Sequence, residues 1–133
     1  MLNGIIPISW SPALQALLRV ITGLLFVEHG TMKLFAFPVA QPGTENGLPT
    51  IALIAALIEV IGGLLFTAGF LTRWAAFIMS GEMAVAYFMA HVSRGGFWPG
   101  VNQGEAAILF CFIFLFFAAA GPGAYSVDEG RKA

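Results

Sequence analysis

Four long apolar stretches constrain the fold of this chain more than any other feature of its sequence. They cover residues 12–35, 50–68, 74–92 and 103–120. Each is close to the roughly 20 residues that a helix needs to cross a bilayer. The chain has 133 residues, of which 59% are hydrophobic and only 10% are charged, whereas a soluble domain averages about 25% charged residues. The sequence therefore predicts an all-α integral membrane protein, a four-helix bundle of antiparallel up-and-down helices forming a single domain over residues 1–133.

Turn-forming residues separate the stretches. Ser11 and Pro12 suit the start of a helix. Residues 36–49 contain three prolines and two glycines and are predicted to be a loop. The turn at Gly69–Arg73 is so short that the helices on either side must lie antiparallel. The single cysteine, Cys111, excludes an internal disulfide, and the net charge of −1 offers no basic surface for nucleic acid.

The distribution of basic residues predicts the orientation in the membrane. An even number of spans places both termini on one side, together with Arg73, Arg131 and Lys132. The opposite side carries Lys33 and Arg94. Because cytoplasmic loops are enriched in Lys and Arg, both termini are predicted to be cytoplasmic.

Three charged residues are expected to meet near the middle of the membrane. Counted from the side of the termini, Arg19, Glu59 and Glu82 come out roughly 12–17 Å deep at about 1.5 Å of rise per residue. They predict a cluster that holds an ion pair and, because it has one negative charge in excess, a proton on one carboxylate. A metal ion would also balance the excess negative charge, but it is expected less than the proton. The alternative is an ion pair that only locks the helices together.

A second polar group is expected near the opposite surface and supplies the candidate ligand-binding residues. It comprises Glu28, His29, Lys33, His91, Asn102 and Glu105. Other roles stay open for its members. Asn102 and Glu105 fit a variant of the capping box at a helix start, and Lys33 can extend to the lipid headgroups, as can Arg94. Two histidines on different helices, His29 and His91, are only a weak indication of haem or metal binding.

Several short motifs recur in a known order. Arg19 and Gly23 precede His29-Gly30-x-x-Lys33-Leu34 in the first stretch. The later motifs are Glu59-x-x-Gly62-Gly63, Gly69-x-x-Thr72-Arg73, Glu82, Asn102-x-Gly104-Glu105 and Gly121-Pro122-Gly123-Ala124-Tyr125-Ser126-Val127-Asp128. With this order and spacing the chain resembles, over nearly its whole length, the DoxX family of small four-helix membrane proteins. The resemblance implies a bacterial inner-membrane protein with a role in redox chemistry, since the related DoxD subunit belongs to a thiosulfate:quinone oxidoreductase.

The sequence leaves three functions open, and it leaves open whether the chain is itself an enzyme. The leading interpretation is a membrane subunit or partner of a soluble or membrane oxidoreductase system that contacts quinone, with the charged cluster supplying protons. The alternatives are a non-catalytic scaffold or assembly factor and a small four-helix transporter. The expected surroundings are the lipid bilayer, an oxidoreductase partner and a possible second copy of the chain, with no nucleic acid. Quinone is the candidate cofactor, and haem or a metal is not expected.

Overall fold

The computed structural model describes residues 4–132, which form helices and contain no strand. Three helices are long and apolar enough to cross a membrane, namely Ile8–Phe35, Thr50–Ala68 and Thr72–Gly95. A fourth apolar helix, Glu105–Ala120, is shorter. The predicted all-α membrane class is confirmed.

The first span has no π-helical interruption. A short 3₁₀ turn, η1 (Ile8–Trp10), leads into α1 (Ser11–Phe35), which carries a proline in its first turn. This position suits proline because its missing N–H would have no partner inside the helix. The helix ends where Ala36 adopts a left-handed conformation with φ 50°. The chain then enters the loop at residues 36–49.

The second and third spans each contain a π-helical segment. The second consists of α2 (Thr50–Leu57), η2 (Ile58–Gly62) and α3 (Gly63–Ala68). The third consists of α4 (Thr72–Ala86), η3 (Tyr87–Val92) and α5 (Ser93–Gly95), and so runs beyond the predicted 74–92 at both ends. Single π turns inside α-helices are rare and often mark functional sites. Here they contain Glu59 and His91.

The rest of the chain forms α6 (Pro99–Asn102), α7 (Glu105–Ala120) and α8 (Val127–Gly130). The predicted helix 103–120 thus begins two residues later, because Gln103 takes a left-handed φ of 60° and separates α6 from α7. The last element, α8, is a short turn in the polar tail.

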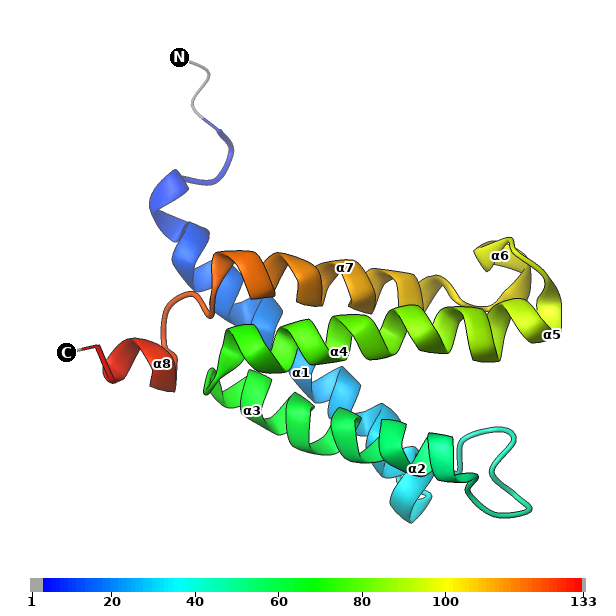
Figure 1. The fold of residues 1–133 in the computed structure, drawn as a ribbon. Coiled ribbons are helices and arrows are strands. Elements are labelled where there is room, and N and C mark those ends of the chain that lie inside the picture. The colour runs from blue at the N-terminus through cyan, green and yellow to red at the C-terminus, as the bar shows by residue number, and fades with distance from the viewer. Residues whose placement is uncertain (1–3, 133) are drawn as a thin grey trace.

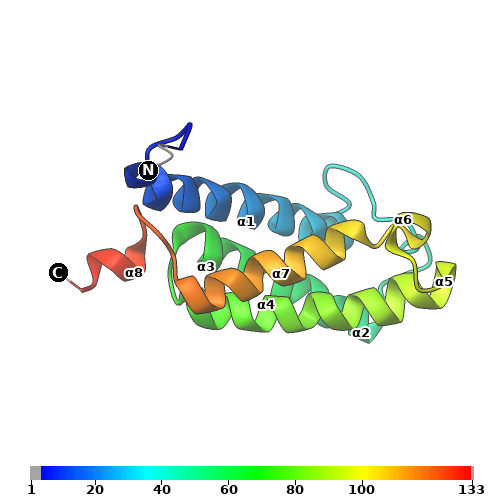
Figure 2. The same ribbon diagram turned by 90° about the horizontal axis from the view of Figure 1, so that it is seen from above.

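The helices are arranged as two packed pairs. One pair is α4 and α7, which lie side by side and run in opposite directions (Figure 1). The other is α1 with the span α2–η2–α3, and α1 runs at an angle to this span (Figure 1). Seen from above, α1 lies on the side of α7 away from α4 (Figure 2). The pairs meet where α4 packs on η2 and α3. The start of α1, the α3–α4 turn and α8 lie at one end, and the 36–49 loop with α5 and α6 lies at the other (Figure 1).

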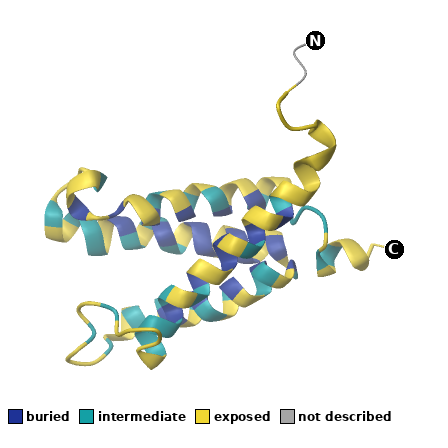
Figure 3. Ribbon diagram, turned by 180° about the vertical axis from the view of Figure 1, so that it is seen from behind, coloured by how far each residue is buried: buried dark blue, intermediate teal, exposed yellow. Residues whose placement is uncertain are grey.

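Aromatic side chains fill the space between the pairs. Phe26 of α1 lies with its ring 5.2 Å from that of Phe110 and 4.7 Å from that of Phe114, both on α7. Phe66 of α3 meets Phe114 and Phe117 at 5.1 Å and 4.9 Å. Buried residues line the inner faces, and the outer faces are mostly exposed (Figure 3). An apolar outer face is expected of a protein surrounded by lipid.

Glycines let α1 approach the second span closely. A Cβ on Gly30 would lie 2.5 Å from Val60 Cγ2 and 3.0 Å from the Ala56 carbonyl oxygen. A Cβ on Gly63 would lie 2.7 Å from Val27 Cγ2. Small residues at such contacts are typical of helices packed in membranes. The contact places the last turns of α1 directly against η2.

Candidate functional site

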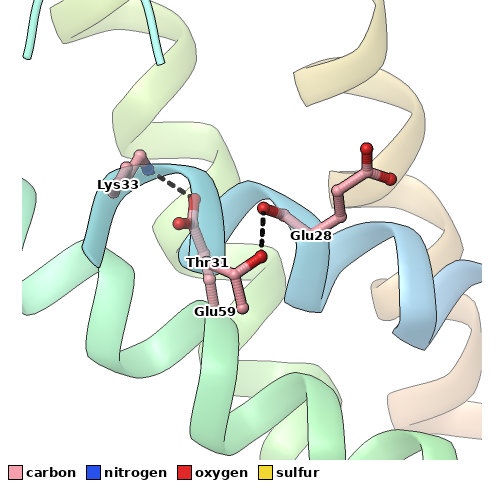
Figure 4. A network of polar contacts seen from close by, with 4 residues as sticks. All are labelled: Glu28, Thr31, Lys33 and Glu59. Carbon is pink, nitrogen blue, oxygen red and sulfur yellow. Dashed lines mark hydrogen bonds and ion pairs between the residues drawn. The ribbon is translucent and has the colours of Figure 1, made fainter. Parts of the chain in front are cut away.

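An ion pair joins the first two spans inside the protein. Lys33 Nζ, in the last turn of α1, lies 2.6 Å from Glu59 Oε1 of η2 (Figure 4). Their side chains are 13% and 2% exposed, respectively. The Gly30 contact makes this possible, because it brings the end of α1 against η2. A charge-assisted bond of this kind, shielded from water, is much stronger than one on a surface.

Glu82 of α4 adds a second carboxylate to this ion pair. Both of its side-chain oxygens are buried, and so is Glu59 Oε2, yet none of the three has a hydrogen-bond partner among residues 4–132. α4 packs against η2, the segment that contains Glu59, and so brings Glu82 near the Lys33–Glu59 pair. We call Lys33, Glu59 and Glu82 the acidic cluster. If both carboxylates were ionised, the cluster would carry one uncompensated negative charge inside the protein.

Arg19 does not join this cluster, contrary to the sequence-based expectation. Its buried guanidinium donates hydrogen bonds to four backbone carbonyls: Thr67 at 3.4 Å, Ala124 at 3.2 Å, Tyr125 at 2.8 Å, and Pro122. Counting residues inward from the helix ends gave Arg19 the wrong neighbours. The reason is that α1 is tilted and extends beyond the other helices at the end that carries α8 (Figure 1). The cation beside Glu59 is Lys33 instead.

The carbonyls bound by Arg19 belong mostly to the C-terminal segment, residues 121–131, which folds back on the α3–α4 turn. Asp128 accepts hydrogen bonds from the amides of Leu71 and Thr72, both at 2.9 Å. Leu71 has a left-handed φ of 50°, which is unfavourable for a non-glycine residue. Burial disfavours the charged form of Asp128, but these hydrogen bonds and the charge of Arg131 outweigh it and hold its pKa below the usual range.

His91 and Asn102 belong to a separate network at the opposite end. The side chain of Asn102 donates to the carbonyl of Gly96 at 2.7 Å and to the hydroxyl of Tyr87 at 3.3 Å, and accepts from the amide of Gly104 at 2.8 Å. His91 Nδ1 lies 3.1 Å from the Asn102 carbonyl oxygen. Asn102 therefore shapes the turn before α7, and the expected capping box is absent, because the N-cap of α7 is Gly104 without a side-chain bond.

The remaining candidate residues are scattered. The His29 ring stands at 90° to that of Phe110, with 5.7 Å between centroids. Glu28 is exposed on α1 and points away from the Lys33–Glu59 pair (Figure 4). Glu105 is exposed in the first turn of α7. Across residues 4–132 no group of three or more His, Cys, Asp or Glu side chains is placed to hold a metal ion.

Two residues of these networks were not assigned a role from the sequence, although Asp128 ends one of the motifs named above. The buried hydroxyl of Tyr87 donates to the Phe97 carbonyl, and Asp128 holds the α3–α4 turn. Asp128 had a detectable signal, because Ser126 is followed by two acidic residues, a pattern that caps a helix, and Ser126 Oγ does accept a bond from the Glu129 amide at 3.2 Å. Tyr87 had none, since one tyrosine in an apolar helix reads as interfacial.

Two hollows lie on the surface of the spans. An apolar groove of about 310 Å³ runs between the second and third spans, with Ile58, Gly62, Ala75, Ile78 and Met79 among its lining residues. A notch of about 350 Å³ on α1 is lined by Leu24, Val27, Glu28, Thr31, Phe37 and Pro38. Of the two hollows, the groove has lining residues next to the acidic cluster in the sequence. Ile58 adjoins Glu59, and Met79 lies one turn before Glu82.

Several apolar helices long enough to cross a bilayer, with charged side chains paired between them, are typical of a multi-pass membrane protein. Within that class the DoxX family model matches residues 14–92, more than half of the chain, and the chain belongs to the DoxX family. The resemblance noted in the sequence is thereby confirmed.

Two of three similar proteins are named as inner membrane proteins. An uncharacterized protein of Haemophilus influenzae is 40% identical over 123 residues, covering 90% of this chain and 92% of its own. The inner membrane protein YqjF of Escherichia coli is 33% identical and covers 84% and 86%, and the inner membrane protein YphA of that organism is 27% identical and covers 89% and 90%. These names and the apolar helices support a bacterial inner-membrane location. No solved structure is significantly similar to the chain.

Proposed function

We propose that this protein is a membrane subunit or partner of an oxidoreductase system, and that its acidic cluster delivers a proton to a quinone. The observation that carries the proposal is the buried, unpartnered carboxylate of Glu82 beside the Lys33–Glu59 pair. Ionisable groups inside a membrane are costly and typically mark proton or ion pathways. A carboxyl group held neutral by its surroundings can act as a general acid.

The chemistry of quinone reduction matches this cluster. Reduction to the quinol consumes electrons and an equal number of protons. In our proposal the partner oxidoreductase supplies two electrons, and Glu82 gives one proton to a quinone oxygen and is then ionised; after it is reprotonated from the aqueous side, it gives the second proton to the other oxygen. Lys33 stabilises the charge left on the carboxylate pair, because it lies 2.6 Å from Glu59. A proton from the aqueous side then restores the cluster.

The apolar groove supports contact with a molecule of this kind. Ala75, Met79 and Glu82 lie on one face of α4 at helical spacing, so the wall of the groove leads to Glu82 within one turn. A volume of about 310 Å³ is at the lower end of the range for small-molecule sites. The groove would hold part of an isoprenoid tail while the ring lies near the carboxylate.

The proposal includes an arrangement in the membrane. All four helical segments cross the bilayer as an antiparallel four-helix bundle in one domain, although α7, with 16 residues, is only about 24 Å long. Both termini face the cytoplasm, on the side of Arg73, Arg131 and Lys132. A scaffold is less well supported, because a protein that only holds helices together is expected to pair its buried charges, and Glu82 has no partner among residues 4–132.

The proposal is tested by purifying the full chain in mild detergent with and without cross-linking, extracting bound small molecules, and assaying quinone reduction in membranes. We expect quinone to co-purify and the Glu82→Gln membranes to reduce quinone at least about 100-fold more slowly, which is the lower range for loss of a general acid. Glu105→Gln, at an exposed site, serves as the matched control. Absence of any bound redox molecule, together with unchanged reduction in Glu59→Gln and Glu82→Gln, would refute the proposal.

A further inference from the structure

Glu28 is a charged residue on the outward face of a membrane span. It lies seven residues before Phe35, the last residue of α1, and so about 10 Å from the end of the helix. Among residues 4–132, no side chain or backbone group bonds to its carboxylate (Figure 4). A helix surface at this depth contacts lipid, where an uncompensated carboxylate is costly. A cationic group from outside the chain would compensate the charge at this position.

The notch around Glu28 is a formed feature. After Ala36 reverses the chain, Phe37 and Pro38 fold back along α1 and make one wall. Thr31 fixes this wall, because its hydroxyl bonds to the Phe37 carbonyl at 2.9 Å and the Phe37 amide bonds to the Thr31 carbonyl at 3.3 Å. Leu24 and Val27 form the deeper side. The result is a hollow of about 350 Å³ with one carboxylate at its edge.

The surroundings of the notch are charged toward the membrane surface and apolar toward the middle of the bilayer, as in an amphiphilic molecule. Leu24 lies one turn deeper than Glu28 on the same face, and Leu17 and Ile21 continue the exposed apolar stripe toward the middle of the bilayer. The carboxylate thus lies near the surface and the apolar stripe runs inward. A phospholipid in that leaflet has the same order, with its headgroup outside and its chains inside.

A second copy of this chain fits the notch poorly. The two cations within the first span are already engaged, Lys33 by Glu59 and Arg19 by backbone carbonyls. Arg94 is exposed at the end of the third span, near Gly43 of the 36–49 loop, and so lies closer to the helix ends than Glu28 does. At the depth of Glu28 itself, a partner copy would therefore bring mainly apolar surface.

We infer that the notch binds the headgroup of a lipid that carries a primary ammonium, such as phosphatidylethanolamine. The ammonium donates a charge-assisted hydrogen bond to the Glu28 carboxylate, and one acyl chain lies along Leu24, Ile21 and Leu17. This site is separate from the acidic cluster and does not depend on the function proposed for it.

The inference is tested with the full chain by native mass spectrometry from detergent micelles doped with lipids of identical acyl chains. The probes are phosphatidylethanolamine, phosphatidylglycerol and phosphatidylcholine. We expect the wild type to retain phosphatidylethanolamine over phosphatidylglycerol, and Glu28→Gln to lower that ratio about tenfold, the effect of one charge-assisted hydrogen bond. Phosphatidylcholine, whose ammonium has no N–H, is expected to bind more weakly than phosphatidylethanolamine.

Two variants separate a specific site from a general effect of charge. Glu129→Gln neutralises an exposed carboxylate in the C-terminal segment and is expected to leave the lipid ratio unchanged. Glu28→Asp keeps the charge and is expected to restore part of the preference, and helix content by circular dichroism shows that each variant is folded. Equal retention of the lipids by the wild type, an unchanged ratio in Glu28→Gln, or stoichiometric cross-linking of position 28 to another protein would overturn the inference.

Discussion

At the scale of single residues, the main polar feature of the interior is the ion pair between Lys33 and Glu59. Both side chains are almost shielded from solvent, and each is the other's only charged hydrogen-bond partner among the described residues. The energetic value of such a pair is asymmetric. Removing one partner leaves a buried charge without compensation, whereas replacing both by apolar groups is often nearly neutral.

The Lys33→Met variant tests this asymmetry. We expect it to lower the free energy of unfolding by about 3–5 kcal/mol, because Glu59 loses its partner. The double variant Lys33→Met, Glu59→Met is expected to be more stable than either single variant. Denaturant titration in detergent micelles measures all three, and a double variant as unstable as the sum of the singles would show that the pair is not coupled.

Asp128 gives a prediction about pH. Its pKa is lowered in the folded protein from an ordinary value of 3.8. The stabilisation it provides is therefore complete well above pH 3.8 and is lost as the pH falls through the lower folded value. We expect the C-terminal segment to become protease-sensitive in that acidic window, and Asp128→Asn to be sensitive already at neutral pH. A wild type and an Asp128→Asn variant with identical pH profiles of cleavage would argue against this role.

At the scale of helices, the sequence predicted the elements better than their mutual positions. Apolar composition, with prolines and glycines between the stretches, was enough to locate the spans. The angle of α1 could not be read from composition, and it decides that Arg19 meets the C-terminal segment while Lys33 meets Glu59. The π turns at η2 and η3 also leave no visible mark in the sequence. The added residue shifts the helical pattern by about 100°, but this shift does not show in spans that are apolar on nearly every face.

Close packing of α1 on the second span gives a prediction with a matched control. Gly30→Ala places a methyl group 3.0 Å from the Ala56 carbonyl oxygen and the Val60 nitrogen, so the helices must separate. We expect a loss of about 1–3 kcal/mol of stability. Gly81→Ala, where nothing lies within 4 Å, is expected to be neutral or to stabilise α4 by up to about 1 kcal/mol. Thermal unfolding in micelles compares the two, and equal effects would contradict the packing described.

At the scale of the whole molecule, the chain is a small DoxX-family membrane protein whose two ends differ. The end with α8 is closed by the C-terminal segment, which Arg19 and Asp128 fasten. The opposite end carries the 36–49 loop and the α5–α6 connection (Figure 1). The acidic cluster draws its residues from three spans: Lys33 from the last turn of α1, Glu59 from η2 and Glu82 from α4.

The proposed orientation is tested by cysteine labelling. In a Cys111→Ser background, a cysteine at position 45 lies in the 36–49 loop and one at position 129 lies in α8. We expect a membrane-impermeant thiol reagent added to intact spheroplasts to label position 45 and to spare position 129. The reverse pattern would place the termini outside, and labelling of both positions would contradict a four-span topology.

Infrared difference spectroscopy of the purified protein in lipid detects the proton held by the acidic cluster, because a protonated carboxyl group has its own carbonyl band. We expect such a band at neutral pH, lost or shifted in Glu82→Gln and in Glu59→Gln and unchanged in Glu105→Gln. We also expect the band to shift in deuterated water, since the cluster must release its proton. Absence of the band in the wild type, or a band untouched by both cluster variants, would contradict a proton stored between Glu59 and Glu82.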